Sequence, residues 1–109
     1  MSRRHEGPTP VVVALERFLQ RSGIAERLEE AAVVPEWAER VGDRIAAVTR
    51  PLRVSRGTLF VAVRSSAWLM ELRMMEGEIL QRLNQDRDRG RIKRIRFLMD
   101  EEAPGPGGS

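Results

Sequence analysis

The stretch "RGTLFVAVRSSAWLMELRMM", residues 56–75, changes its hydrophobic period halfway along. In residues 59–63 apolar side chains fall on every second position, which is the period of a β-strand with one buried face. From Trp68 onward they recur every three or four positions, the period of an amphipathic helix. Ser65 and Ser66 stand at the change, and serine is a preferred helix cap. The stretch therefore predicts a strand that leads directly into one long helix.

Two further strands are predicted on either side of this unit. Residues 52–54 alternate like residues 59–63, and the short segment "SRG" between them predicts an antiparallel hairpin. Downstream of a polar loop, "RIKRIRFLM" at residues 91–99 alternates again. Its inward side chains are Ile95, Phe97 and Met99, and its outward ones are Arg94 and Arg96.

Three helical segments precede the hairpin. In "PVVVALERFLQRSG", residues 10–23, apolar residues have helical spacing and the final glycine is placed as a stop. A second segment covers residues 24–34. A third, residues 35–49, carries a stripe that Gly42 interrupts, which indicates a bend or a close neighbour. That stripe consists of Trp37, Val41, Ile45 and Val48.

Three strands with one buried face, and helices packed on that face, predict an α+β two-layer domain. We expect one domain over residues 9–100. The flanking segments 1–8 and 101–109 have the composition of flexible tails, because their polar, glycine and proline residues cannot bury enough apolar surface to become ordered.

Length and composition limit the classes of protein that are possible. A chain of 109 residues has room for one modest core. No apolar run approaches the roughly 20 residues of a membrane span, so no membrane partner is expected. The N-terminus lacks an apolar stretch before a cleavage site, which favours a cytosolic protein over a secreted one.

Proton-transfer or nucleophilic catalysis needs positioned groups of suitable acidity, and the sequence offers few. His5 is the only histidine, cysteine and tyrosine are absent, and most acids alternate with arginines as on solvated helix faces. No phosphate-binding or dinucleotide motif is present. We therefore expect a binding protein and not an enzyme, with no cofactor, no metal and no small-molecule substrate.

The positive charge is concentrated in arginine and in one segment. Of the 19 basic residues only Lys93 is lysine, a choice typical of bidentate phosphate contacts, although a genomic bias toward arginine codons has the same effect. Between Arg82 and Arg96 seven basic residues stand against two acids. The alternative is that these arginines keep an edge strand soluble. The nucleic-acid site predicted from this distribution consists of Arg87, Arg89, Arg91, Lys93, Arg94 and Arg96.

The five aromatic residues are few and mostly fit core stripes, so we expect phosphate contacts in place of base stacking. Trp68 is expected in the core. Trp37 fits either the core or a partner contact. Phe60 lies on the strand face opposite the core, where it either docks to another protein or is covered by the first helix.

An ordered set of positions along the chain resembles the DciA family, long catalogued as a domain of unknown function. The first group is Trp37, Val41, Gly42, Thr49 and Pro51. The second is Gly57, Leu59, Val61, Val63, Ser65, Ala67, Trp68, Glu71 and Leu72. The third is Ile79, Leu80, Leu83, Asn84, Ile92, Ile95 and Phe97. The resemblance covers about residues 10 to 99.

The resemblance implies a bacterial DNA replication protein, a helicase loader that binds the replicative helicase DnaB and promotes its loading on DNA. It also implies a KH-like domain, weakly sequence-selective DNA-binding to single and double strands, and a cytoplasmic, nucleoid-associated location. The Gly-x-x-Gly clamp of KH domains occurs here only at Gly105–Gly108, in the tail. Many members carry a long basic extension, whereas the tails here are short, so weak DNA binding by the chain alone is expected. A KH-like RNA-binding module and a protein adaptor without nucleic-acid contact remain alternatives.

Overall fold

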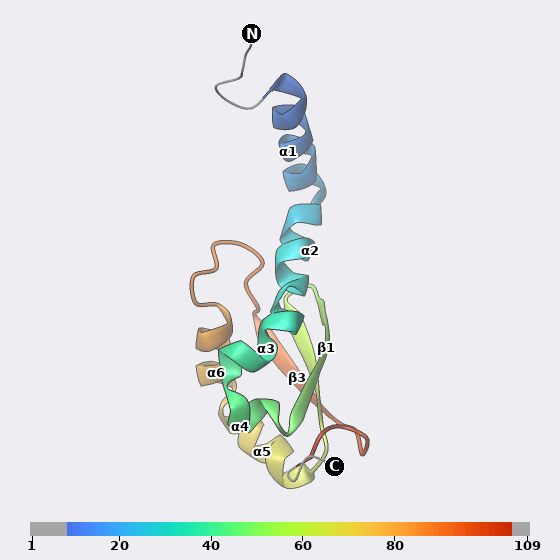
Figure 1. Cartoon of the computed structure of the whole chain (residues 1–109), viewed down its shortest axis with the longest axis vertical. Helices are drawn as coiled ribbons and strands as arrows, with labels where there is room; N and C mark the ends of the chain where they lie inside the picture. Colours follow the sequence, from blue (N-terminus) through green and yellow to red (C-terminus); the bar gives the residue numbers. More distant parts are fainter. Residues whose placement is uncertain (1–8, 106–109) are drawn as a thin grey trace.

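A computed structural model describes residues 9–105, so the expected N-terminal tail and the last four residues lie outside the described part. Figure 1 shows helices α3 to α6 gathered on one side of the sheet, with α1 extending away along the long axis. The helices are α1 (Pro10–Ser22), α2 (Ile24–Ala31), α3 (Val33–Val41), α4 (Asp43–Ala46), α5 (Ser66–Met74) and α6 (Glu76–Leu83). The strands are β1 (Thr49–Ser55), β2 (Thr58–Val63) and β3 (Arg94–Met99).

The sheet has the order β1-β2-β3, with β2 at the centre. Strands β1 and β2 form the expected antiparallel hairpin, and Arg56 and Gly57 at its tip have φ values of 51° and 81°. Positive φ at both central residues is typical of the tight turn that matches the twist of two paired strands. Strand β3 returns parallel to β2 after α5 and α6. The predicted α+β class is confirmed.

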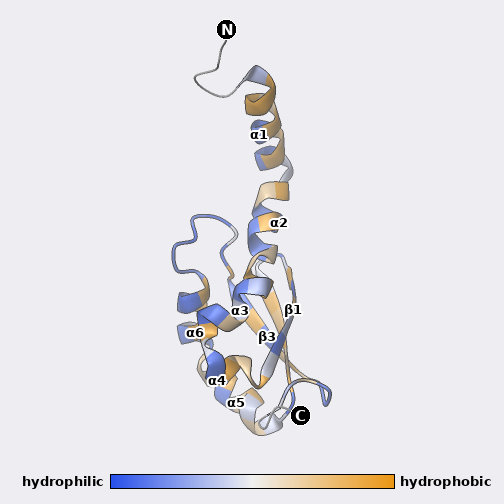
Figure 2. Ribbon diagram, in the orientation of Figure 1, coloured by the Kyte–Doolittle hydropathy of each residue, from blue (hydrophilic) through white to orange (hydrophobic). Residues whose placement is uncertain are grey.

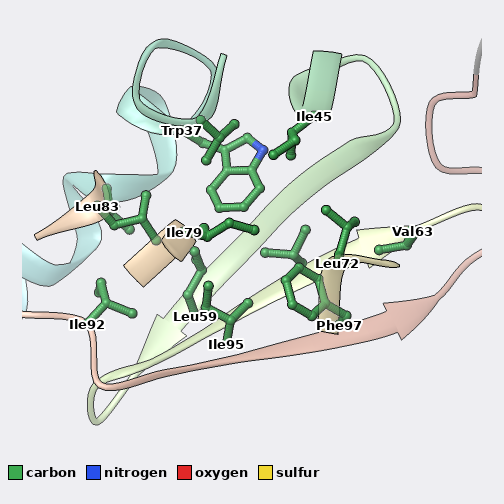
Figure 3. Packing of buried hydrophobic residues seen from close by; sticks show 13 residues of the cluster. Trp37, Ile45, Leu59, Val63, Leu72, Ile79, Leu83, Ile92, Ile95 and Phe97 are labelled. Atoms are coloured by element: carbon green, nitrogen blue, oxygen red, sulfur yellow. The ribbon is translucent and has the colours of Figure 1, made fainter. Parts of the chain in front are cut away.

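The core lies between one face of the sheet and helices α3, α5 and α6 (Figure 3). Each strand contributes alternate side chains to it, as the period of two requires. The residues with no exposed surface include Val33, Leu59, Val61, Val63, Leu72, Ile79 and Leu83, and Phe97 and Ile95 are nearly as buried.

Trp37 belongs to this core, with 2% of its surface exposed. Its indole Nε1 donates a hydrogen bond of 2.9 Å to the hydroxyl of Thr49, which in turn donates to the carbonyl of Ile45 at 2.7 Å. A buried indole N–H needs a partner, and Thr49 supplies one without exposing the ring to water. Of the two interpretations of Trp37, the structure shows the core residue and not a surface for a partner.

The expected long helix is two helices, α5 and α6, separated at Met75 with φ −96° and ψ 5°. Of the two serines that could cap this helix, Ser65 does so, accepting a hydrogen bond of 3.1 Å from the backbone N–H of Trp68. Helix α5 contacts β2 and β3, whereas α6 contacts α3 and β3. The bend lets the two halves follow different neighbours, and a straight helix could not meet both.

Gly42 separates α3 from α4 with φ 94° and ψ 161°. A Cβ at this position would meet nothing within 4 Å. Of the two meanings expected for Gly42, the structure therefore shows the bend and not the close neighbour: glycine is favoured by the backbone conformation.

Two arginines join α3 to α6 by capping each other's helix. Arg82 Nη1 donates to the carbonyl of Val41 at the end of α3 (3.1 Å). Arg40 Nη1 donates to the carbonyl of Gln85 beyond the end of α6 (2.8 Å). Each guanidinium satisfies carbonyls that a helix end leaves without a partner. These arginines therefore have structural roles.

Helix α1 differs from the expected packing of helices on the sheet. Its bounds are as predicted, with Pro10 in the first turn and Gly23 as a left-handed cap, but none of its residues is buried. Among the described elements it contacts α2 and no strand. Phe18, an aromatic residue of this helix, is 52% exposed. The helix is an arm, and the molecule is 63 Å long for this reason.

Candidate nucleic-acid interface

The predicted basic segment is divided by the structure, and Arg87 is in its buried part, with 8% of its surface exposed. Its Nη1 donates to the carbonyl of Glu29 in α2 (2.6 Å) and its Nε to that of Leu83 in α6 (3.0 Å). Its Nη2 lies 3.1 Å from a carboxylate oxygen of Glu36 in α3. Arg87 thus links three helices, and its side chain is not free to meet a nucleic acid.

The loop between α6 and β3 is held at several points although it is strongly hydrophilic (Figure 2). The amide of Asn84 donates to the carbonyl of Ile92 (2.9 Å) and accepts from its N–H (2.7 Å). The N–H of Gly90 donates to Glu26 in α2 (2.9 Å). The loop is therefore fixed to α2 and closed on itself.

Arg89 and Arg91 are exposed on this loop, but their neighbours differ from those of β3. Arg89 lines a hollow with Glu16 and Gln20 of α1. Arg91 Nη1 donates to the carbonyl of Arg87 (3.1 Å). Arg89 therefore lies beside the helical arm and its Glu16, whereas Arg91 is bonded back to its own loop.

The remaining predicted residues lie on the sheet. Arg94 and Arg96 alternate with the buried Ile95 and Phe97, so they project from the sheet face opposite the helices. The residues of β1 and β2 that share this orientation follow from the strand register. We call this surface the open face; its residues are Arg50, Arg53, Ser55, Thr58, Phe60, Ala62, Arg94, Arg96 and Leu98.

Four of the nine open-face residues are arginines and none is acidic. All four arginines and Leu98 are exposed, Phe60 is partly exposed, and Thr58 and Ala62 are buried between them. Only Arg50 has an ion-pair partner within residues 9–105, Asp100, at 2.7 Å. Arg53 lies over the ring of Phe60, with its Cζ 4.3 Å from the ring centroid. The face can attract an anion and present an aromatic ring to it.

Two more basic residues extend this charge to the hairpin tip. Lys93 donates its backbone N–H to the carbonyl of Gly57 (2.7 Å), which places it beside the turn that contains Arg56. Both side chains are exposed. The basic surface therefore continues from the centre of the sheet to one of its ends.

Arg50, Arg53 and Arg56 were missed by the sequence prediction. The two-residue turn at the hairpin tip pairs Arg53 with Phe60, and the register shift between Pro51 and Arg53 then places Arg50 opposite Ala62 on the same face. Alternation alone puts Leu52 and Val54 on one face, which is correct for Val54, but it does not locate a bulge. Alternation counted outward from the two-residue turn does place Arg53 opposite Phe60, so that arginine could have been found from the sequence.

Trp68 lies at the other end of the molecule and is half-buried, with Arg44 Cζ 5.7 Å from its ring centroid. Its expected place in the core is therefore partly wrong, since it packs against the core from the edge. Phe60 is not covered by the first helix, because α1 does not contact β2.

Two other properties concern the described part as a whole. In residues 9–105 no group of three or more histidine, cysteine, aspartate or glutamate side chains is arranged to hold a metal ion. None of the helices described is long and apolar enough to cross a membrane.

The fold and its open face define a small α+β domain with a basic sheet surface. Residues 10–97 match the family model described as "Dna[CI] antecedent, DciA". The chain belongs to the DciA family, a membership that fits a role in DNA replication, and the resemblance seen in the sequence is confirmed.

Curated relatives support this membership. A UPF0232 protein of Rhodococcus jostii is 30% identical over 90 residues, which are 83% of this chain and 48% of that protein. A UPF0232 protein of Mycobacterium tuberculosis is 32% identical over 76 residues, 70% of this chain and 41% of that protein. One of Mycolicibacterium smegmatis is 32% identical over 88 residues, with shares of 74% and 45%. The chain spans less than half the length of these relatives.

Proposed function

We propose that this protein is a non-enzymatic DNA replication factor that binds the replicative helicase DnaB and promotes its loading on DNA. The observation that carries the proposal is the family match over residues 10–97. Hydrolysis of ATP then belongs to the helicase. This role places the protein in the cytoplasm, at the nucleoid.

The DNA contact in this proposal is supported by the open face and the hairpin tip. Exposed arginines without carboxylate partners attract phosphates, and each phosphate neutralised releases counterions. None of these side chains is positioned by a base-reading element such as a helix that enters a groove, so contact with little sequence preference is expected. The proposed site includes Arg94 and Arg96 on the sheet and Lys93 at the hairpin tip, all of them exposed. It does not include Arg87, because that side chain is buried.

The helicase part is tested by affinity purification of the tagged protein from its own organism, followed by mass spectrometry. DnaB should be recovered, and purified DnaB should bind the purified protein directly. In a loading assay, adding the protein should increase the amount of DnaB on circular single-stranded DNA. Failure of the purified pair to associate would overturn this part of the proposal.

The DNA part is tested with the double variant Arg94→Ala/Arg96→Ala. Its affinity for DNA should fall, and the slope of log affinity against log salt should decrease by about 0.7 to 0.9 for each phosphate that the variant no longer neutralises. The matched control is Arg17→Ala/Arg21→Ala, which removes the same charge from exposed positions of α1. Equal losses of affinity in both doubles would show that only net charge matters and would contradict the assignment.

The second candidate is a KH-like RNA-binding module. The pair of helices between β2 and β3 favours it, because KH domains clamp RNA at a Gly-x-x-Gly loop between two helices. The junction here, Met74–Gly77, has glycine only at its last position, which favours DNA. Titrations with single-stranded DNA, duplex DNA and RNA at one salt concentration separate the candidates, and a strong preference for RNA would favour the second.

A further inference from the structure

A row of three side chains crosses the middle of the open face. In the strand register Arg53 of β1 is opposite Phe60 of β2, and Phe60 is opposite Arg96 of β3. Neighbouring strands lie about 4.8 Å apart, so the row is about 10 Å wide. Phe60 is therefore an aromatic residue with an arginine opposite it on each neighbouring strand.

The charge around this row is positive and uncompensated. Within residues 9–105 neither Arg53, Arg94 nor Arg96 forms an ion pair, and the one carboxylate paired with this face, Asp100, is at the end where Arg50 lies. Arg53 and Arg96 face each other across β2 at about 10 Å, a separation at which like charges still repel at low salt. A polyanion that passes over β2 would relieve this repulsion, which makes the face complementary to a nucleic-acid backbone.

The aromatic ring decides which nucleic acid fits. Arg53 rests on Phe60 at 4.3 Å from Cζ to centroid, so the planar guanidinium covers one face of the ring and presents a flat surface of its own. Unpaired bases stack on such surfaces, both on aromatic rings and on arginine planes. In a duplex the faces of the bases are already stacked on each other. The row can therefore add stacking only to a single strand.

From these observations, and resting on the proposed function, we infer that the open face binds single-stranded DNA by stacking an unpaired base at Phe60 and Arg53. Arg94 and Arg96 hold phosphates on one side of that base. Arg56 and Lys93 continue the path of the backbone to the hairpin tip. This surface shares Lys93, Arg94 and Arg96 with the site predicted from the sequence. The loop residues Arg89 and Arg91 lie outside it.

The test compares Phe60→Leu with the wild type. The variant keeps an apolar side chain but removes the ring. Affinities are measured by fluorescence anisotropy at fixed salt for a mixed-sequence DNA oligonucleotide, its duplex and the RNA of the same sequence. Phe60→Leu should bind the single DNA strand about tenfold more weakly, which is within the range for loss of one stacked base, and the duplex nearly unchanged. Phe60→Trp, which keeps an aromatic ring, should bind the single strand at least as well as the wild type.

The matched control is Leu98→Ala, which shortens another apolar side chain of the open face without removing a ring. This variant should bind all three nucleic acids with affinities within about twofold of those of the wild type. Thermal unfolding of each variant shows that the fold is kept. Wild-type binding of single strands by Phe60→Leu, or an equal loss for duplex, would overturn the inference. The inference would also be overturned if Phe60→Leu lost its association with DnaB and still bound single strands normally, because the face would then be a protein-docking surface.

These results also separate the inference from the proposed function. If Phe60→Leu has no effect while Arg94→Ala/Arg96→Ala weakens DNA binding, the stacking inference fails and the proposed DNA contact stands. If neither variant has an effect, the proposed DNA contact fails as well. A single strand of RNA bound tenfold more tightly than DNA would overturn the choice of DNA.

Discussion

Helix α1 and the helix pair α5–α6 have the same kind of sequence and opposite environments. Each carries apolar residues at helical spacing with charged residues on the other faces. In α5–α6 the stripe is buried, and Leu72 has no exposed surface. In α1 Leu15 is 55% exposed and Val11 76% exposed. Amphipathic spacing therefore predicts a helix but does not say whether the same chain supplies its partner.

The two regions are held in helical form by different interactions. Helix α5 begins directly after β2 and its side chains enter the core. Helix α1 is stabilised by hydrogen bonds at its two ends. The Thr9 hydroxyl accepts one from the N–H of Val12 at 3.2 Å, and Gly23 caps the other end. An isolated helix of about 12 to 15 residues is marginal in water. The arm should therefore open locally at a much smaller free energy than the rest of the molecule.

The largest effect is expected for Leu72→Ala, in the packed region. Removing a buried leucine side chain costs the transfer free energy and leaves a cavity, so the free energy of unfolding should fall by about 3 kcal/mol. Urea unfolding followed by circular dichroism measures this change. A loss under about 1 kcal/mol would mean that the core collapses around the site or that Leu72 is not packed as described.

A smaller effect is expected for Gly90→Ala. Gly90 is in the loop between α6 and β3, where this loop meets α2, between the arm and the packed region. Gly90 has φ 67°, and a Cβ there would contact Glu29 Cβ and lie 2.8 Å from the backbone N of Glu30. The free energy of unfolding should fall by about 2 kcal/mol, through backbone strain and displacement of the loop. Hydrogen exchange should show reduced protection in α2 before α5.

The control for this prediction is Gly77→Ala. Gly77 lies in the first turn of α6, and a Cβ there would meet nothing within 4 Å. Alanine should stabilise the helix by up to about 1 kcal/mol, because glycine loses more backbone freedom on folding. If Gly90→Ala were equally harmless, the loop would not be seated on α2 in solution.

Much of the fold follows from local patterns. The change of period after residue 63 predicts both β2 and α5, and one of the two serines at the change, Ser65, is the cap. The break at Met75 was missed because the apolar stripe continues across it without a change of spacing. The bend serves two different neighbours, β2 and α3, and neither neighbour is visible in the local sequence.

The candidate site was predicted less well, for a related reason. Charge along the sequence identifies basic residues, but burial separates them: Arg87 is a structural link, whereas Arg94 and Arg96 are exposed. Arg50 reaches the open face only through the bulge in β1, and Arg96 meets Phe60 only through a parallel strand pairing. Both are long-range features that composition and period do not encode.

The smallest effect is expected for Leu15→Ala, which makes in α1 the same substitution as Leu72→Ala makes in α5. Leu15 is 55% exposed, and alanine has the higher helix propensity, so the free energy of unfolding should change by less than about 0.5 kcal/mol. Urea unfolding at two protein concentrations measures it. A loss above about 1 kcal/mol that grows with protein concentration would show that α1 packs against another copy in solution, and the same loss at both concentrations would show that it folds back on its own domain. Either result would remove the contrast between the two helices, because the leucine stripe of α1 would then be buried like that of α5.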